Sequence, residues 1–307
     1  MGLTVVGTVA FDAIETPYGK TDKIIGGAGT YVALSASYFN KDINLISVVG
    51  EDFPQDYLDL LKKHNIDING IQIKEGEKTF FWKGKYHKDM NVRDTLATEL
   101  NSLENFDPVV PSEYQNTDYL MLGNLTPLVQ RQVIERMKKR PKLIVMDTMN
   151  FWMDIMLDEL KETISMVDVI SINDEEAQQL SGKNTLVKAA KVIHAMGPKY
   201  IIIKKGEHGA LLFGEGKVFS APALPLEYAF DPTGAGDTFA GGFIGYLAKT
   251  NDISFENMKN AVIAGSVMAS FNVEKFGTER IVELTEKEIN ERIAKFVELT
   301  TFNMRKI

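Results

Sequence analysis

Residues 231–243 of the chain read DPTGAGDTFAGGF. The glycines at positions 234 and 236 allow backbone N–H groups to converge on an anion, and residues 237–249 have the composition of a helix. A glycine turn that opens onto a helix N-terminus forms a cradle for an oxyanion or a phosphate group. Asp237 at this N-terminus also fits a plain helix cap, and the residues alone leave both interpretations open.

Three further glycines stand inside the predicted helix, at Gly241, Gly242 and Gly245. Each costs roughly 1 kcal/mol relative to alanine in a helix interior. That cost is offset where a ligand or another backbone must approach closely, or where the helix packs tightly against a sheet. The pattern predicts a close approach at this helix without saying what makes it.

Two better-known phosphate-binding motifs do not occur. The sequence has no Gly-x-x-x-x-Gly-Lys-Ser/Thr pattern, which excludes a Walker-type loop. A dinucleotide-binding fold carries its Gly-x-Gly-x-x-Gly motif after the first strand, where this chain has Gly7 alone. Phosphoryl transfer is therefore favoured over hydride transfer, and a dinucleotide-dependent oxidoreductase is the weaker hypothesis.

The order of apolar segments predicts an α/β fold. Strands are expected at residues 3–6, 43–49, 119–122, 143–146, 167–172 and 200–204, and helices at 29–39, 54–64, 128–139, 154–165, 184–196 and 256–271. This alternation, with apolar and β-branched strands, implies a parallel sheet covered on both faces. Residues 71–100 break the pattern with aromatic and charged side chains, which favours short antiparallel strands that form a lid. A surface insertion without a role is the alternative.

Composition narrows the function further. The 307 residues carry 34 basic and 42 acidic side chains, and the net charge of −8 argues against nucleic acid as the main partner. The absence of cysteine excludes a thiolate nucleophile and a cysteine zinc site, and four histidines leave little for a histidine metal site. The sequence has no sorting signal and no apolar run of about 18 residues, so we expect no membrane span and a cytoplasmic protein.

Residues 231–243 resemble the C-terminal signature of the ribokinase-like (PfkB) carbohydrate and nucleoside kinases. Three more elements resemble the family and stand in its order: GGAG at 26–29, NDEE at 173–176 and GEHG at 206–209. The resemblance covers most of the chain. It implies a single ribokinase-like kinase domain over residues 1–307, built as a three-layer α/β/α sandwich with a mainly parallel central sheet. It also implies a small β lid, contributed mainly by residues 71–100.

The resemblance assigns the chemistry to the glycine turn. Asp237 is expected to act as the catalytic base, which deprotonates a substrate hydroxyl as its oxygen attacks the γ-phosphorus of ATP. The N–H groups of Gly234, Ala235 and Gly236 are expected to hold the phosphoryl oxygens. Each such donor is worth ~3–4 kcal/mol of transition-state stabilisation in other enzymes. One turn would thus supply both the base and the anion hole.

The nucleotide side is also implied by the resemblance. The expected nucleotide-binding residues are Asn173, Lys204, Gly206, Gly209 and Asn272, and Glu176 is expected to hold Mg²⁺ through water. In some relatives the positions of Asp231 and Thr233 hold a monovalent cation, so an activating K⁺ is predicted there. Taken alone, Asn173 and Glu176 also fit a capping box, and Lys204 either reaches a phosphate or is solvated.

The acceptor side is expected to comprise Asp12, Gly26, Gly27, Tyr31 and Arg93. A carboxylate at position 12 can accept two hydroxyl hydrogens of a sugar, and the two glycines would let the backbone approach that sugar. Ribokinase-type relatives often carry Asn at the position of Tyr31, so the resemblance does not extend to ribose itself. The tyrosine either stacks on a ring or fills the core.

The predicted function is ATP- and Mg²⁺-dependent transfer of phosphate to a hydroxyl of a small sugar or nucleoside. The alternative is a non-catalytic sugar- or nucleoside-binding protein on the same scaffold, against which the retained Asp237 argues. Exposed aromatic side chains on a projecting lid also predict a homodimer formed through the lid. Further side chains that are candidates to face the acceptor are Trp82, Tyr86, Asn91, Asp147 and Asn150.

Overall fold

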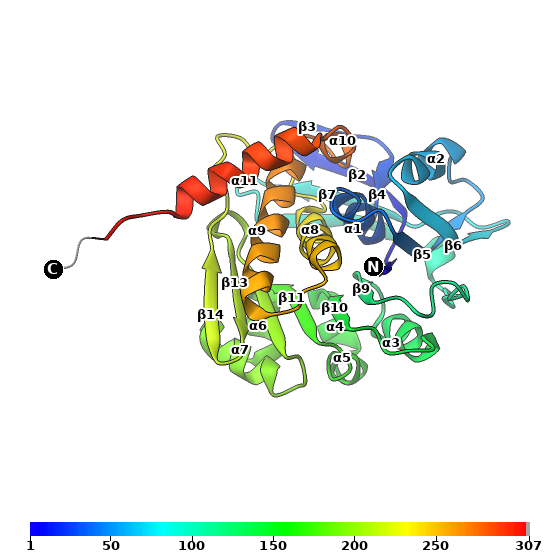
Figure 1. The fold of residues 1–307 in the computed structure, drawn as a ribbon. Helices are drawn as coiled ribbons and strands as arrows, with labels where there is room; N and C mark the ends of the chain where they lie inside the picture. The colour runs from blue at the N-terminus through cyan, green and yellow to red at the C-terminus, as the bar shows by residue number, and fades with distance from the viewer. Residues whose placement is uncertain (305–307) are drawn as a thin grey trace.

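The computed structural model describes residues 1–304, and its body is built on a sheet of nine strands (Figure 1). The strands lie in the order β14-β13-β12-β11-β10-β9-β1-β5-β6. Every neighbouring pair from β12 to β6 is parallel, and β13 and β14 extend the sheet as an antiparallel hairpin. The bounds are β1 Leu3–Val6, β5 Ile43–Gly50, β6 Ile66–Lys74, β9 Tyr119–Leu122, β10 Leu143–Asp147, β11 Val169–Asn173, β12 Tyr200–Lys204, β13 Ala210–Gly214 and β14 Lys217–Ala221. The mainly parallel sheet predicted from the sequence is confirmed.

Helices cover both faces of this sheet (Figure 1). One face carries α1 (Ala28–Ala36), α2 (Gln55–Lys63), α8 (Ala235–Thr250), α9 (Phe255–Asn272), α10 (Glu279–Val282) and α11 (Glu286–Thr300). The other carries α3 (Pro127–Arg136), α4 (Asn150–Ile155), α5 (Leu157–Ile164), α6 (Asp174–Ser181) and α7 (Leu186–His194). Successive strand residues alternate between the two cores, so that Val5 packs with the first group and Val6 with the second. The result is the expected three-layer α/β/α sandwich.

A second, smaller sheet forms the lid. Its strands follow the order β3-β2-β7-β8, and β4 also pairs with β2. The bounds are β2 Ala10–Thr16, β3 Gly19–Lys20, β4 Ile24–Gly26, β7 Phe81–Tyr86 and β8 Arg93–Glu99. The predicted lid segment supplies the antiparallel pair β7–β8, but residues 10–26 supply the other three strands and residues 71–74 belong to β6. Because β2 is buried along nearly its whole length, it lacks the apolar–polar alternation that marks a half-exposed strand.

The helix predicted at 154–165 corresponds to α5, and its first residues belong to a separate short helix, α4, which begins at Asn150. Met156 between α4 and α5 has φ −142° and ψ 43°, which lies outside the helical region. The other predicted helices are present, with bounds that differ by a few residues.

Close packing between helices explains the glycines inside α8. A Cβ at Gly241 would lie 2.3 Å from the carbonyl oxygen of Val32, and one at Gly245 would lie 2.8 Å from Cα of Ala36. Both neighbours belong to α1, and Gly242 approaches α9 in the same way. The close approach that these glycines predict is therefore made by two helices, and neither the sheet nor a ligand is needed to explain it.

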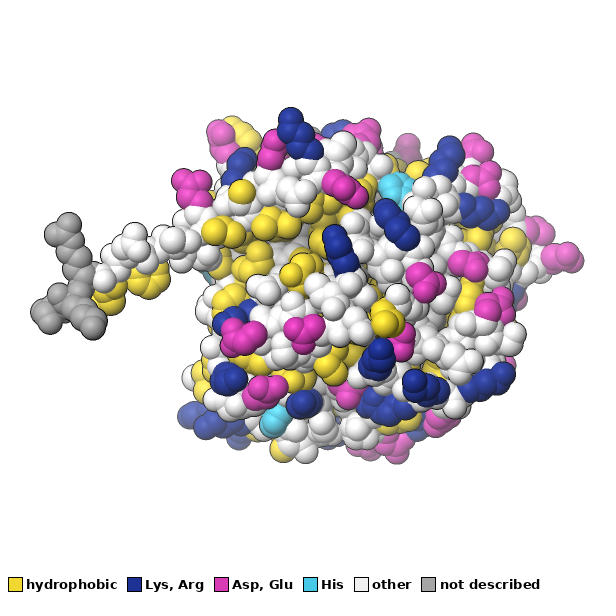
Figure 2. Space-filling model, in the orientation of Figure 1, with side chains coloured by type: hydrophobic (Ala, Val, Ile, Leu, Met, Phe, Trp, Pro, Cys, Tyr) yellow, Lys and Arg dark blue, Asp and Glu magenta, His cyan; other side chains and the backbone are white. Residues whose placement is uncertain are grey.

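The face drawn in Figure 2 shows acidic and basic side chains interspersed, with apolar side chains visible between α11 and its neighbours. That face therefore carries no extended patch of one charge. Among the helices of residues 1–304, none has both the length and the apolar character needed to cross a bilayer.

Candidate active site

Three strand ends bring polar side chains to one edge of the central sheet. Asp147 is the last residue of β10, Asn173 of β11 and Lys204 of β12. The three strands are adjacent and parallel, so these residues share the carboxyl-end edge of the sheet. Ligands of open α/β sheets bind at this edge.

The glycine turn leads directly into α8. Gly234 is the N-cap residue and has φ 73°, a left-handed conformation that favours glycine. The N–H of Ala235 donates to the carbonyl oxygen of Pro232 at 3.1 Å and closes the turn. The N–H groups of Gly234 and Gly236 have no acceptor among residues 1–304. Two of the three donors predicted for the anion hole are therefore free, and the third is used within the turn.

Lys204 lies against this turn. Its Nζ donates to Oδ2 of Asp147 at 2.7 Å, and a Cβ at Gly236 would lie 3.1 Å from the same Nζ. Burial alone would lower the pKa of Lys204, but the carboxylates of Asp147 and Glu176 outweigh burial and raise that pKa. The charged ammonium form is therefore stabilised. Of the two interpretations that the sequence left open for Lys204, the solvated one is wrong, because its side chain is only 16% exposed.

Asp237 stands in the first turn of α8. Burial and the nearby charge of Asp147 raise the pKa of Asp237 to about 7, although Lys204 and Arg93 partly offset them. A carboxylate whose pKa lies near neutral pH is well matched to accept a proton from a hydroxyl. The catalytic role of Asp237 stays a prediction that this environment fits.

Asn173 and Glu176 form a capping box at the start of α6. The N–H of Glu176 donates to Oδ1 of Asn173, and the N–H of Asn173 donates to Oε2 of Glu176, both at 2.8 Å. Burial and Asp147 raise the pKa of Glu176 to about 7, and Lys204 opposes them. The capping role is thus present, and it leaves Oε1 of Glu176 for another partner.

The carboxylates at this edge of the sheet fit a Mg²⁺ ion only if phosphate oxygens supply some of its ligands. Within residues 1–304 no three His, Asp or Glu side chains are arranged to hold a metal ion. Mg²⁺ is commonly held by one or two carboxylates, with waters and substrate phosphates completing its octahedral shell. Glu176, with a free carboxylate oxygen beside Lys204 and Asp147, fits such an open arrangement.

Asp12 lies against Gly26, the last residue of β4, and Gly27 follows as the N-cap residue of α1. A Cβ at Gly26 would lie 1.9 Å from Oδ2 of Asp12, and one at Gly27 would lie 2.4 Å from the carbonyl oxygen of Thr8. Gly27 also has φ 90°, which favours glycine. Burial and the charge of Asp231 raise the pKa of Asp12 to about 7 against a backbone hydrogen bond from Gly27. Gly26 is therefore required for this carboxylate to fit, whereas Gly27 is required by its φ and by its close approach to Thr8.

Tyr31 forms part of the floor of the glycine turn. Its side chain is 1% exposed, and a Cβ at Gly234 would lie 2.5 Å from its ring. Its hydroxyl has no hydrogen-bond partner among the described residues. Burial and the charges of Asp12 and Asp231 raise the pKa of Tyr31 well above its usual range. Of the two interpretations from the sequence, these contacts match core filling beneath the turn.

Asp231 and Thr233 fasten the turn to the rest of the protein. Oδ1 of Asp231 accepts from the N–H of Thr233 at 2.9 Å, and Oδ2 accepts from the N–H of Gly277 at 2.8 Å. The hydroxyl of Thr233 donates to the hydroxyl of Tyr86 at 3.2 Å, which links the turn to lid strand β7. Sequence reasoning missed Gly277, because a lone glycine 46 residues away carries no motif. The cation role of Asp231 and Thr233 stays a prediction.

Asn272 supports the same turn from α9. Its Nδ2 donates to the carbonyl oxygen of Thr233 at 2.7 Å, and its Oδ1 accepts from the hydroxyl of Thr238 at 3.0 Å. The side chain has no exposed surface. The contacts of Asn272 therefore hold the turn in place. They do not test the prediction that Asn272 lies beside the nucleotide.

Gly206 and Gly209 bracket a short 3₁₀ turn, Gly206–His208, after β12. A Cβ at Gly206 would lie 2.4 Å from Oδ1 of Asn91, so the tip of the lid reaches this loop. A Cβ at Gly209 would lie 2.0 Å from the carbonyl oxygen of Ala221 in β14. The loop predicted to border the nucleotide is thus in contact with the lid.

Arg93 carries a positive charge from the lid to the site. It begins β8, and its guanidinium carbon lies 5.8 Å from the ring centre of Trp82. Its charge lowers the pKa of Asp237 and of Glu176, although burial dominates at both. Asn150, by contrast, donates to Gln179 of α6 and joins two helices. The structure therefore brings Arg93 to the candidate site and leaves Asn150 outside it.

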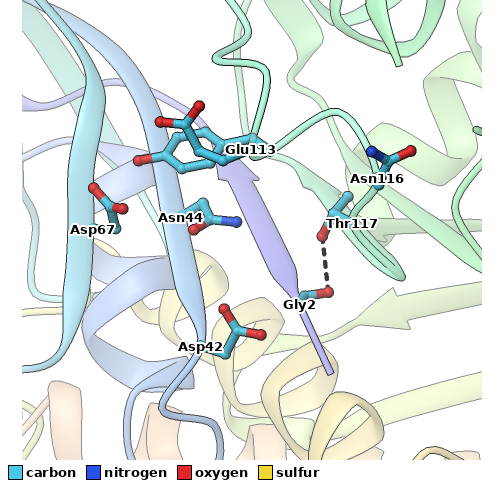
Figure 3. Close-up of a pocket in the computed structure, with 8 residues that line it drawn as sticks. Gly2, Asp42, Asn44, Asp67, Glu113, Asn116 and Thr117 are labelled. Atoms are coloured by element: carbon cyan, nitrogen blue, oxygen red, sulfur yellow. Dashed lines mark hydrogen bonds between the residues drawn. The ribbon is translucent and has the colours of Figure 1, made fainter. Parts of the chain in front are cut away.

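A pocket at the opposite edge of the sheet is shown in Figure 3. It is lined by Gly2, Asp42, Asn44, Asp67, Glu113, Tyr114, Asn116 and Thr117. These residues stand at or just before the amino ends of β1, β5, β6 and β9, and the hydroxyl of Thr117 donates to the carbonyl oxygen of Gly2 at 2.8 Å. None of the predicted site residues lines this pocket.

Comparisons with known proteins identify the family and the fold. A model of the pfkB family of carbohydrate kinases matches residues 2–284. The cytidine kinase of Thermococcus kodakarensis is 32% identical over 250 residues, which cover 80% of this chain and 87% of that protein. The crystal structure of the Methanocaldococcus jannaschii nucleoside kinase has a TM-score of 0.78 at 23% identity and covers 96% of this chain and 99% of its own.

A putative ribokinase II from E. coli, solved with ATP and Mg²⁺, has a TM-score of 0.78 at 19% identity, over 97% of this chain and 99% of its own. These likenesses show the same fold. The family model matches nearly the whole chain. The prediction of a ribokinase-like kinase is confirmed, and the chain belongs to the pfkB family of carbohydrate kinases.

Proposed function

We propose that this kinase transfers the γ-phosphoryl group of ATP to a hydroxyl of a nucleoside or a small sugar. The observation that carries the proposal is the place of Asp237, in the first turn of α8 beside the free N–H groups of Gly234 and Gly236. The ammonium of Lys204 lies against the same turn. A base, an anion hole and a cation therefore share one turn.

The positions of the site residues suggest a separate role for each of them. ATP with Mg²⁺, when bound, supplies the phosphoryl group and neutralises the charge that develops on it. Asp12 accepts hydrogen bonds from hydroxyls of the acceptor and orients it, while Asp237 takes the proton of the attacking hydroxyl. The N–H groups of Gly234 and Gly236 bind phosphoryl oxygens, and Glu176 offers its free oxygen to Mg²⁺, through water.

A nucleoside is the first acceptor to test, because the relatives described above include a cytidine kinase and a nucleoside kinase. With ATP and Mg²⁺, we expect ADP release to depend on adding a nucleoside, in a panel that also contains ribose, fructose and other small sugars. ADP release with sugars only would support the kinase reaction but show that the acceptor is a sugar and not a nucleoside. Silence across the whole panel, with ATP binding confirmed, would favour the non-catalytic binder.

The pH profile of kcat/KM should have its acid limb near pH 7. Burial raises the pKa of Asp237 to about 7, so the base is protonated below that pH and its activity is lost as pH falls. Because Asp12 and Glu176 also have a pKa of about 7, the rate should fall at least roughly tenfold for each pH unit. Initial rates at fixed free Mg²⁺ from pH 5.5 to 9 measure this, with circular dichroism at pH 5.5 as the folding control. A limb near the ordinary range of aspartate would contradict the assignment.

We further propose that two copies pair through the lid. β8 is the outer strand of the lid sheet, and Val92, Leu96 and Leu100 on or beside it are 44–50% exposed. A second lid would cover these apolar side chains.

We also propose that Asp231 and Thr233 hold an activating K⁺. Replacing K⁺ in the assay by a larger organic cation tests this proposal, and the rate is expected to fall.

A further inference from the structure

A buried ion pair crosses the carboxyl-end edge of the central sheet. Lys204 at the end of β12 reaches past β11 to Asp147 at the end of β10. The side chain of Asp147 is 7% exposed and that of Lys204 is 16% exposed. Burying two charges has a large desolvation cost, which packed apolar side chains at the same positions would avoid. The place of the pair, at the edge where ligands bind, points to a role other than stability.

Asp147 is a fixed anchor. Its Oδ1 accepts from the N–H of Thr148 at 2.7 Å, and its carbonyl oxygen accepts from Nε2 of Gln130 at 2.9 Å. Gln130 has no exposed surface and also donates to the carbonyl oxygen of Gly123 at 2.9 Å. Asp147 is thus held by the residue that follows it and by α3, so the atom that accepts from Lys204 has a defined position.

The Lys204 ammonium has donors to spare. An ammonium group has three N–H donors, and Asp147 is its one acceptor in the described part of the chain. Because a Cβ at Gly236 would lie 3.1 Å from Nζ, the ammonium lies against the glycine turn. The free N–H groups of Gly234 and Gly236 belong to the same turn. Donors from two elements therefore converge where an anion with several acceptor oxygens would fit.

We propose that Lys204 binds the transferred phosphoryl group of ATP and that Asp147 is a positioning residue that holds the ammonium at the glycine turn. The inference rests on the proposed function for the identity of the ligand. The pair also sets the charge around the base. Lys204 from β12 and Arg93 from β8 favour the carboxylate form of Asp237, whereas Asp147 from β10 opposes it.

Nucleotide binding tests the proposal without any acceptor. Calorimetry with AMP-PNP and with ADP, each with Mg²⁺, compares ligands that differ by the terminal phosphoryl group. In Lys204→Met we expect AMP-PNP binding to weaken by roughly tenfold or more, because a charge-assisted hydrogen bond is lost, and ADP binding to change by less than about twofold. The control Lys205→Met removes the neighbouring lysine and should change neither. Equal weakening for both nucleotides, or no weakening, would overturn the proposal.

The pH dependence of the activity separates a positioning role of Asp147 from a merely structural role of the ion pair. In Asp147→Asn the acid limb of kcat/KM should move to lower pH, because a carboxylate that raises the pKa of Asp237 has become neutral. In Lys204→Met the limb should move to higher pH, because a cation that lowers that pKa is gone. A structural pair would lower the melting temperature in both variants without these opposite shifts. Shifts in the same direction, or no shifts, count against the proposal.

A double variant covers the case in which Lys204→Met does not fold. That variant leaves the Asp147 carboxylate buried without its partner, which is strongly destabilising. D147N/K204M removes both charges, so it should fold, bind ADP like the wild type and show the same loss for AMP-PNP. Unchanged AMP-PNP binding in the double variant would overturn the proposal. Failure of the proposed function is distinguishable, since it would show as a wild type that binds both nucleotides and phosphorylates no acceptor.

Discussion

Asp237→Asn is expected to lower kcat by a factor of about 10²–10⁴, the usual contribution of a positioned general base. Asparagine has nearly the same shape as aspartate but cannot accept the proton of the attacking hydroxyl. The Mg²⁺-nucleotide affinity should change little, because the N–H groups of Gly234 and Gly236 and the ammonium of Lys204 remain in place. The loss should therefore be one of kcat and not of nucleotide binding.

Stability provides an independent check on the same variant. The pKa of Asp237 is raised in the folded protein from 3.8 to about 7, chiefly by burial. The folded state therefore loses stability as the pH rises from about 4 to about 7, and the whole cost is present above that pH. Asparagine carries no charge, so at pH 8 D237N should melt at or above the wild-type temperature. The matched control is Asp56→Asn, an exposed residue in the first turn of α2, which should leave kcat unchanged. A D237N protein that is fully active would refute the base assignment, and one that is inactive because it is unfolded would contradict the burial argument.

Gly234→Ala should remove most of the activity and a large part of the stability. Gly234 has φ 73°, and an added Cβ would lie 2.5 Å from the ring of Tyr31. Real Cβ atoms do not approach that closely, so either the ring or the turn must move. Tyr31 is buried and has little room, so we expect the turn to shift and its free N–H groups to leave their positions. Strain at this φ and overpacking together should lower the free energy of unfolding by about 2–4 kcal/mol, and kcat should fall by about 10² or more.

Gly216→Ala isolates the steric part of this effect. Gly216 has φ 70°, close to that of Gly234, but a Cβ there would meet no atom within 4 Å. This control should lose about 1 kcal/mol from backbone strain alone and keep full activity. Denaturant unfolding and initial rates of both variants measure the difference. If the two variants lost equal stability and both stayed active, the contact between Gly234 and Tyr31 would not matter to the turn.

The fold could be predicted from the sequence because local patterns determine it. Short apolar strands such as 143–146 and 200–204, with helices between them, leave a parallel sheet as the simplest arrangement. The strand β2 could not be found in this way, because it is buried along nearly its whole length and carries no alternation. Its parallel partner β7 lies 70 positions away, at Phe81 opposite Phe11, and no local pattern reports such a pairing.

In the candidate site, too, local features could be predicted from the sequence and contacts between distant residues could not. The place of Asp237 follows from one short motif, since glycine turn and helix are adjacent in sequence. The partner of Lys204 could not be assigned, because Asp147 lies 57 residues earlier, on a strand that is not its neighbour. Asn272 was predicted beside the nucleotide, yet both its polar atoms bond within the protein, a fact that only the packing of α9 against α8 decides.

The composite origin of the lid limits how this enzyme can be recombined with its relatives. Strands β2, β3 and β4 come from residues 10–26, and β7 and β8 come from residues 81–99. A chimera that exchanges only the later segment would join foreign β7 and β8 to a native β2, across the parallel seam between Phe11 and Phe81. No single continuous segment of the chain contains the whole lid. A chimera meant to change the acceptor preference must therefore exchange both lid segments, residues 10–26 and residues 81–99, in the same gene.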